Sequence, residues 1–322
     1  DARAAGPFEF MIAIGFSFEY VLTNLLFVPF MSGAAHNGDM ATVTFGFSAQ
    51  SDEARHMTLG LEIIKFLLEQ HEDNVETVQK WIDKWFWRGS RLLTIVAMMM
   101  DYMLPNKVMS WKEAWEVYFE EAGGALFKDL ARYGIRMPKY AETIEKEKEH
   151  ISHQAWWTFY THGHAAGFHT WIPTDEELDW LSEKYPETFD KYYRPRWELA
   201  KKMEAKGERF YTKALPQLCT TCQIPMLFTE MDDPTQLSYR DTVHEGERYH
   251  FCSDGCKDIF CEEPEKYVQS WLPVHQIFQG NCGGPGVENV LSDFYRMNLG
   301  VDNMDMTDSP DEKRWKQWKG VA

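Results

Sequence analysis

The sequence predicts a mainly α-helical protein with a small cysteine-rich module toward its C-terminus. From Phe8 to about residue 170, apolar residues recur at three- and four-residue spacing, which is typical of helices that bury one face. Two close pairs of cysteines follow after residue 218. Hydrophobic residues make up 44% of the 322 residues and aromatic residues 15%, so the chain can bury a large core and is not disordered.

The charge balance excludes two classes of partner. The chain has 33 Lys and Arg against 50 Asp and Glu, a formal net charge of -17, and no block of basic residues. Phosphate backbones and anionic lipids are bound by faces rich in Lys and Arg. We therefore expect neither nucleic acid nor an acidic membrane surface as a partner.

The stretch from Phe8 to Met31 is apolar enough to suggest a membrane span, but it contains Glu9, Glu19, Asn24 and Pro29. A carboxylate near the centre of a bilayer costs roughly 2.5 kcal/mol or more. The stretch is therefore predicted to be a buried helix of a globular protein, in which Glu19 needs a partner. Six cysteines in a chain of this length do not predict a disulfide framework, and the reducing cytoplasm is the expected location.

Local signals place the helices in order. Residues with side-chain oxygens stand where helices should begin, and Gly or Pro where they should end. Two of these starts are Ser/Thr-x-x-Glu capping boxes. The predicted helices run from Phe8 to about Ser32, from Asp39 to about Gln70, from Asn74 to Met103, from Ser110 to about Tyr133 with a break at Gly123-Gly124, and from Thr174 to about Pro186.

The character of the sequence changes after about Gly207. The alternating run from Val243 to Phe251 predicts a small β-hairpin among the paired cysteines. The last residues, from Met304 to Ala322, are polar and charged, which suits an arm that packs on a partner. We therefore expect a helical domain at 1–206, a zinc-binding knuckle at 207–275 and a C-terminal extension at 276–322.

Glu53 and His56, in the second predicted helix, are the strongest indication of chemistry. Their spacing places both side chains on one helical face. Carboxylate and imidazole suit iron, manganese or zinc, and four-helix carboxylate proteins build a dimetal site from two such motifs and two lone Glu residues. Glu19 can supply a lone Glu, because the turn at 32–39 lets the first two helices pack antiparallel.

A second copy of the spacing, Glu147 and His150, serves as a control. Its neighbours are charged, so we expect it on a solvated helix face, whereas Phe45, Phe47 and Leu59 make the flanks of Glu53 apolar. Ionisable groups in apolar surroundings are costly unless they are ligated or paired. Packing and hydrogen bonding are the roles expected of the later histidines, His150, His153, His162, His164 and His169.

Two segments carry a family resemblance. Residues 16–24, Phe-Ser-Phe-Glu-Tyr-Val-Leu-Thr-Asn, and residues 52–56, Asp-Glu-Ala-Arg-His, resemble the bacterial multicomponent monooxygenase hydroxylases, and most of all the large (alpha) oxygenase subunits of phenol hydroxylases. The step of 34 residues from Glu19 to Glu53 is also that of the family. The resemblance covers the whole chain and implies a ferritin-like di-iron helical bundle, of which this chain holds the C-terminal part.

The resemblance also implies roles for single residues. Glu19, Glu53 and His56 would ligate one half of a carboxylate-bridged di-iron centre, and Thr23 matches the family's active-site threonine. Asp52 and Arg55 would orient the ligands across the site, and Asn24 and Gln50 match polar residues that respond to an effector protein. Ile14, Phe18 and Phe27 could line an aromatic-sized pocket, for which core packing is an equal alternative.

The chain departs from the family pattern at its beginning. The family needs a second lone Glu and a second Glu-x-x-His from upstream helices, and nothing before Glu19 supplies them. We therefore expect a truncated chain that does not assemble two irons by itself, and the predicted function belongs to the intact subunit.

The cysteines Cys219, Cys222, Cys252 and Cys256 form a C-x2-C pair and a C-x3-C pair with 29 residues between them. Four thiolates at these spacings can close a tetrahedral zinc site without an open position, which predicts a structural role. Iron in a rubredoxin-like site is the rival occupant. The segment 249–256 also resembles a small treble-clef-like zinc module, and Cys261 and Cys282 have no expected role.

The sequence thus predicts an oxygenase component that inserts one atom of O2 into phenol or a similar small aromatic. No Rossmann glycine pattern is present, so electrons should come from a separate NAD(P)H-dependent reductase with flavin and an iron–sulfur cluster, as the resemblance implies. Beta and gamma subunits in an (αβγ)2 assembly and a small effector protein are further expected partners. Two alternatives stay open: a hydroxylase for toluene, an alkane or an alkene, and a non-catalytic zinc-knuckle scaffold.

Overall fold

The computed structural model describes residues 5–107, 109–162, 170–208, 219–224, 228–234 and 236–268. The chain divides into two compact units, residues 1–152 and 153–322. The predicted domain boundary near residue 207 falls inside the second unit, and the three domain ranges remain predictions. The predicted arm at 276–322 lies outside the described residues.

The first unit is helical throughout its described length, as predicted. Its elements are α1 (Pro7–Met11), the π-helix η2 (Ile12–Thr23), α2 (Asn24–His36), α3 (Met40–Gln70), α4 (Asn74–Met98), η3 (Met99–Met103), α5 (Trp111–Trp115), the π-helix η4 (Glu116–Gly123), α6 (Gly124–Leu130), the short 3-10 helix η5 (Ala131–Tyr133) and α7 (Ala141–Glu147).

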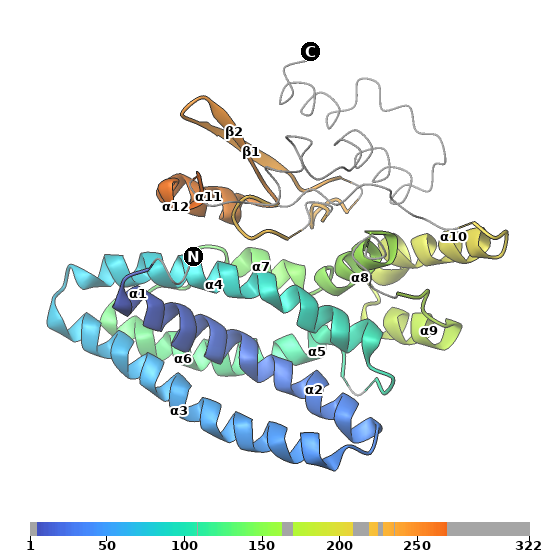
Figure 1. The fold of residues 1–322 in the computed structure, drawn as a ribbon, viewed down its shortest axis with the longest axis horizontal. Coiled ribbons are helices and arrows are strands. Elements are labelled where there is room, and N and C mark those ends of the chain that lie inside the picture. Colours follow the sequence, from blue (N-terminus) through green and yellow to red (C-terminus); the bar gives the residue numbers. More distant parts are fainter. Residues whose placement is uncertain are drawn as a thin grey trace. The chain divides into compact units, whose positions relative to one another are not determined.

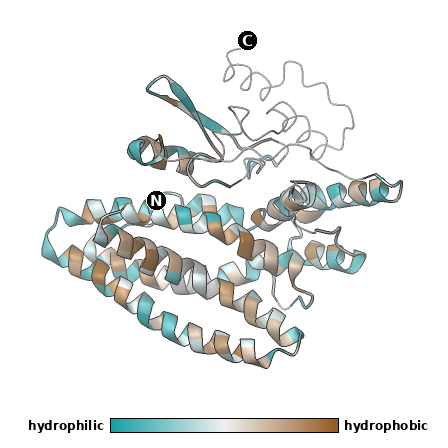
Figure 2. Ribbon diagram, in the orientation of Figure 1, coloured by the Kyte–Doolittle hydropathy of each residue, from teal (hydrophilic) through white to brown (hydrophobic). Residues whose placement is uncertain are grey.

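The core of this unit forms around η2, which packs against α3 on one side and α4 on the other (Figure 1). Figure 2 shows the helix from α1 through α2 to be mostly hydrophobic, in keeping with its place between two partners. Ile12 and Phe16 are buried, and Phe16 meets Phe127 of α6 edge to face with ring centroids 5.9 Å apart. The predicted buried helix is confirmed, and among the described residues no helix is long and apolar enough to cross a membrane.

Local capping signals predicted the helix starts well. The Asp39 carboxylate accepts a hydrogen bond from the Thr42 amide at the start of α3, and Ser110 and Glu113 form the predicted capping box. The predicted break at Gly123-Gly124 is wrong. Gly123 has helical φ and ψ of -65° and -40°, so the helix continues from α5 through η4 into α6.

Glu147 and His150, the second pair with the Glu-x-x-His spacing, are not solvent-exposed. Glu147 and His150 are 6% and 7% exposed, so the prediction of a solvated helix face is wrong. The Glu147 carboxylate pairs with the Arg91 guanidinium, which also lies over the Trp87 ring at 4.3 Å. A distant cation therefore allows this carboxylate to be buried, although its neighbours in sequence are charged.

The second unit contains helices and a small hairpin. Its elements are α8 (Ile151–His162, which begins in the first unit), α9 (Asp175–Lys184), η7 (Phe189–Tyr193), α10 (Arg194–Glu204), β1 (Arg240–His244), β2 (Glu247–Phe251), α11 (Asp254–Glu262) and α12 (Glu265–Val268). The predicted hairpin is confirmed and begins three residues earlier than expected. Its strands pair antiparallel, with Arg240 opposite Phe251, and Glu245 and Gly246 in the turn have φ of 50° and 86°, as a type I′ turn needs.

Two buried side chains fasten the cysteine-rich part to α8 and α10. The Gln154 amide nitrogen donates to Thr229 Oγ1 at 2.7 Å, and the Thr229 amide donates back to Gln154 Oε1 at 3.4 Å. The Arg196 guanidinium of α10 donates to the Pro234 carbonyl at 2.9 Å. Gln154 and Arg196 are 2% and 6% exposed, so these bonds form away from water, where they are costly to break.

Candidate metal centres

The predicted carboxylate and histidine ligands converge between η2 and α3. His56 Nδ1 lies 3.2 Å from Glu53 Oε2 on its own helix and 3.7 Å from Glu19 Oε2 on η2. One ligand atom from each of the three residues lies within 4.8 Å of the others. The Glu19 and Glu53 side chains are 15% and 17% exposed, whereas the His56 side chain is 56% exposed. The three groups could thus hold one metal ion near the surface of this unit.

The cluster has perturbed titration behaviour. Burial, the hydrogen bond to Glu53 and the charge of Glu53 together raise the pKa of Glu19 to about 7, against a lowering effect of His56. The hydrogen bond to Glu53 raises the pKa of His56 above its ordinary value. A metal cation bound beside Glu19 would favour the ionised form of its carboxylate and offset the repulsion from the neighbouring carboxylate.

Two glycines that sequence reasoning missed lie where η2 crosses α3. A Cβ atom built on Gly60 would lie 2.9 Å from Gly15 Cα, and one built on Gly15 would lie 2.9 Å from Gly60 Cα. Backbone therefore touches backbone at this crossing. The available signal was a glycine inside each of two long predicted helices, which costs helix stability and asks for a packing reason.

The remaining predicted residues lie around this cluster. Thr23 Oγ1 donates to the Phe18 carbonyl at 3.0 Å, a five-residue step that suits the π-helix. Arg55 and Asp52 are exposed and paired with each other at 2.9 Å. Gln50 is half-buried, and the side chain of Asn24 lies outside what the structure describes.

The apolar residues around the ligands are more exposed than the sequence suggested. Ile14 and Phe27 are half-buried and Phe18 is 44% exposed, while Phe45 and Phe47 are more than 60% exposed. The apolar flanks of Glu53 therefore do not bury it within the described residues. Its partial burial comes from the side that faces η2.

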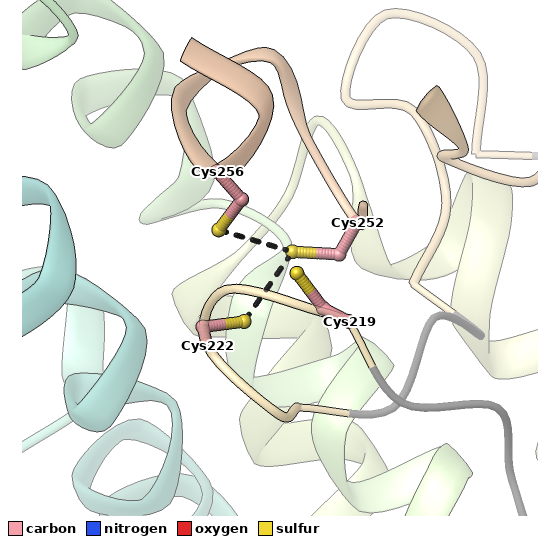
Figure 3. Close-up of side chains that lie close together, drawn as sticks. All are labelled: Cys219, Cys222, Cys252 and Cys256. Carbon is pink, nitrogen blue, oxygen red and sulfur yellow. Dashed lines mark hydrogen bonds between the residues drawn. The ribbon is translucent and has the colours of Figure 1, made fainter. Parts of the chain in front are cut away.

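The four predicted cysteine ligands form a second cluster (Figure 3). Cys252 Sγ lies 3.6 Å from Cys222 Sγ and 3.7 Å from Cys256 Sγ, and all four sulfur atoms lie within 4.8 Å of one another. Four sulfurs at about 2.3 Å from a tetrahedral zinc ion stand about 3.8 Å apart. The thiol group spacing therefore fits a zinc ion, and a rubredoxin-like iron would need the same arrangement.

Local structure explains how the cysteines come together. Cys219 and Cys222 stand on a tight turn that Gln223 closes with φ of 60°, and the Gln223 amide donates to the Cys219 carbonyl at 2.9 Å. Cys252 follows β2, and Cys256 lies in the first turn of α11, which Ser253 caps. Burial raises the pKa of the Cys222 thiol well above its ordinary value, so the thiolate form needs a cation.

The later histidines have packing roles where the structure describes them. His153 is fully buried among Tyr185, Phe189 and Tyr193, with ring centroids 4.5–5.0 Å away. His150 is buried as well. The structure describes no side chain for His162, His164 or His169, and Cys282 also lies outside the described residues.

Comparison with known proteins agrees with this geometry. Residues 2–71, which contain Glu19, Glu53 and His56, match the methane/phenol/alkene hydroxylase family, and residues 228–271 match the YHS domain. The chain is 71% identical over 99% of its length to the oxygenase component of phenol 2-monooxygenase from Pseudomonas sp. strain CF600, of which it covers 62%. It is 29% identical over 88% of its length to the alpha subunit of the alkene monooxygenase oxygenase component from Xanthobacter autotrophicus strain Py2, of which it covers 56%.

A solved structure extends the likeness to the fold. The crystal structure of xenon-pressurised phenol hydroxylase from Pseudomonas sp. OX1 matches with a TM-score of 0.84 and 71% identity, over 98% of this chain and 64% of that chain. This match confirms the predicted ferritin-like helical fold. The chain spans less than two thirds of the length of these relatives. Over the residues that it spans, the chain is similar to phenol hydroxylase oxygenase components, and residues 2–71 match the methane/phenol/alkene hydroxylase family.

Proposed function

We propose that this chain is part of the oxygenase component of a multicomponent phenol hydroxylase, which inserts one oxygen atom from O2 into phenol or a similar small aromatic to give a catechol. The observation that carries the proposal is the convergence of Glu19, Glu53 and His56 in a segment that matches the hydroxylase family. The identity of 71% to a phenol 2-monooxygenase component, against 29% to an alkene monooxygenase, favours an aromatic substrate.

The donor set fits iron. Carboxylate oxygens with an imidazole nitrogen suit Fe, and three such residues are half of what a carboxylate-bridged pair of irons takes from a four-helix bundle. We propose that Glu19, Glu53 and His56 hold this half, and that residues outside this chain supply the other ligands. When bound, the di-iron centre would supply the activation of O2 and the redox chemistry of the insertion.

Other residues of the chain would position and protect this centre. Because burial and the neighbouring Glu53 raise the pKa of Glu19, metal binding would displace the Glu19 proton and leave this carboxylate ionised. Thr23 would place its hydroxyl beside the centre, and Ile14, Phe18 and Phe27 would line an apolar pocket that excludes water. We assign Asp52 and Arg55 to ligand support, and Asn24 and Gln50 to the response to an effector.

We propose a structural zinc ion for Cys219, Cys222, Cys252 and Cys256. The distances of 3.6 and 3.7 Å between sulfurs support this assignment. With four thiolates as ligands, no coordination position is left for water or substrate. The metal would instead fasten the turn at Cys219 and Cys222 to the hairpin and α11, which already pack on each other through the buried rings of Phe251 and Phe260.

The proposed complex contains further components. The activity needs a reductase, with flavin and an iron–sulfur cluster, that draws electrons from NAD(P)H. Beta and gamma hydroxylase subunits and a small effector protein would complete the cytoplasmic assembly. The description of the relatives as components of monooxygenase systems supports separate partners.

Elemental analysis of the full oxygenase complex tests both metal assignments in one experiment. We expect about two irons and one zinc per large subunit. Glu53→Ala should lose iron and keep zinc, and Cys252→Ser should lose zinc. Glu62→Ala is the matched control, because Glu62 is an exposed carboxylate on the same helix as Glu53 and pairs only with Lys65 among the described contacts.

The outcomes separate the candidate functions. Iron in the wild type, its loss in Glu53→Ala and catechol formation from phenol would support the proposal. Zinc without iron in an iron-supplied complex would refute the oxygenase function and leave the scaffold alternative. Hydroxylation of toluene or an alkene, but not of phenol, would move the substrate assignment to the related hydroxylases.

A further inference from the structure

We infer that Gly15 and Gly60 are positioning residues that set the reach between the two ligand-bearing helices. This inference rests on the proposed function and adds to it a determinant outside the ligand set. Gly15 precedes Glu19 by four residues, and Gly60 follows His56 by four. Residues four apart share a helix face, so each glycine lies about one turn from a ligand, at the contact of η2 with α3.

The contact is between backbones. A Cβ atom on Gly60 would meet Gly15 Cα and C at 2.9 Å and its carbonyl oxygen at 3.2 Å. A Cβ atom on Gly15 would meet Gly60 Cα at 2.9 Å and the carbonyl oxygen of His56 at 3.7 Å. The crossing point therefore touches the backbone of His56, a proposed ligand, and the three described atoms nearest to each built Cβ all belong to backbone, which cannot turn aside as a side chain could.

The distances show what a larger residue would do. Carbon atoms in ordinary contact stand about 3.5–4.0 Å apart, so an alanine at Gly60 pushes the helices apart by about 0.6–1 Å. The Glu19 Oε2 to His56 Nδ1 distance of 3.7 Å would then become roughly 4.3–4.7 Å. Two ligands at about 2.1 Å from one metal ion span at most about 4.2 Å. One methyl group would therefore force the ligand side chains to rearrange and would weaken metal binding.

The chain offers two matched controls. Gly89 of α4 faces η2 from the side opposite α3, where its Cβ would meet the Ser17 carbonyl oxygen at 3.3 Å, so Gly89→Ala presses η2 toward α3. Gly124 has no atom within 4 Å of a built Cβ. Gly89→Ala should therefore disturb packing without separating the ligands, and Gly124→Ala should be neutral or slightly stabilising.

The test measures iron binding and folding together in the full oxygenase complex. Iron content, the electron paramagnetic resonance spectrum of the half-reduced centre, helicity and melting temperature are recorded for Gly60→Ala, Gly15→Ala and both controls. We expect Gly60→Ala and Gly15→Ala to lose iron affinity by about 10- to 100-fold, as happens when groups that orient metal ligands are changed. Gly89→Ala should keep iron and the wild-type spectrum even if its melting temperature falls as far.

A further variant, Glu19→Asp, keeps the proposal testable if the two glycine variants do not fold. Glu19→Asp withdraws the carboxylate by one methylene without touching the crossing, so it should reproduce the iron loss. Normal iron and an unchanged spectrum in Gly60→Ala, equal iron loss in Gly89→Ala, or normal iron in Glu19→Asp would each overturn the positioning role. Absence of iron from the wild type would refute the proposed function itself.

Discussion

A buried ion pair near the N-terminus allows a quantitative prediction about what holds α1 against α4. Lys84 Nζ lies 2.9 Å from Glu9 Oε1, and the two side chains are 5% and 7% exposed. Trp85 Nε1 donates to the same oxygen at 3.1 Å. The change that tests this pair is Lys84→Met, which keeps most of the side-chain volume and removes the Lys84 ammonium from the buried Glu9 carboxylate.

The expected loss follows from this geometry. Two unit charges 2.9 Å apart attract by about 6 kcal/mol at an effective dielectric constant near 20. Part of this gain offsets desolvation, and removal of one partner of a buried pair typically costs about 3–5 kcal/mol. Since about 1.4 kcal/mol corresponds to a factor of ten, amide hydrogen exchange in α4 should accelerate by roughly 100- to 1,000-fold or more.

Hydrogen exchange with peptide resolution is the assay, because a chain of two units need not unfold in one step. Lys80→Met is the matched control, since Lys80 is exposed on the same helix. The double change Glu9→Met with Lys84→Met should recover most of the loss, because two apolar side chains leave no buried charge. If Lys84→Met exchanges no faster than Lys80→Met, the pair does not hold α1 to α4.

Three further perturbations have defined outcomes. Ser110→Ala removes the capping box of α5 and should cost about 1 kcal/mol, seen as a lower urea midpoint, whereas an unchanged midpoint would mean that packing alone starts this helix. Hydrogen bonds from the Thr42 hydroxyl and amide lower the pKa of Asp39, so the contribution of Asp39 to stability is present above pH 3.8 and is lost as the pH falls through the folded-state pKa. The difference in melting temperature between wild type and Asp39→Asn should therefore shrink over that range. A difference that stays constant with pH would contradict this. Cys256→Ser should release zinc and make the hairpin more sensitive to protease, whereas Cys261→Ser, at an exposed cysteine, should change neither property. Zinc retained in Cys256→Ser would show that Cys256 is not a ligand.

The parts of the fold that could be predicted from sequence are those fixed by local chemistry. Asp39, Ser110 and Thr174 each place an oxygen where a helix has free amides, and all three helices start there. The proximity of the proposed ligands Glu53 and His56 was equally predictable, because they share one helix and their spacing is set by helical geometry. The antiparallel packing that adds Glu19 followed from the short turn after α2.

Other features depend on contacts that no local pattern contains. No local pattern announced the π-helices η2 and η4, and the helix continues through Gly123 with φ of -65° and ψ of -40° where a break was expected. Glu147 looked solvated because its neighbours are charged, whereas its partner Arg91 lies 56 residues earlier in the chain. A glycine inside each long helix indicated close packing, but the pairing of Gly15 with Gly60 depends on a contact between segments 45 residues apart in sequence.

If the cysteine cluster holds the proposed zinc ion, the hydrogen bonds of Gln154 link the stability of a helical segment to metal supply. A ligand that binds only the folded state adds RT ln(1 + [L]/Kd) to stability, about 2.7 kcal/mol when free metal is 100 times its Kd. Because Gln154 and Arg196 join the cysteine-rich part to α8 and α10, part of this increment reaches helices that contribute no ligand. Starvation for the metal would therefore loosen α8 and α10 together with the cysteine cluster, so the lifetime of this unit against proteases would follow the free metal concentration of the cell.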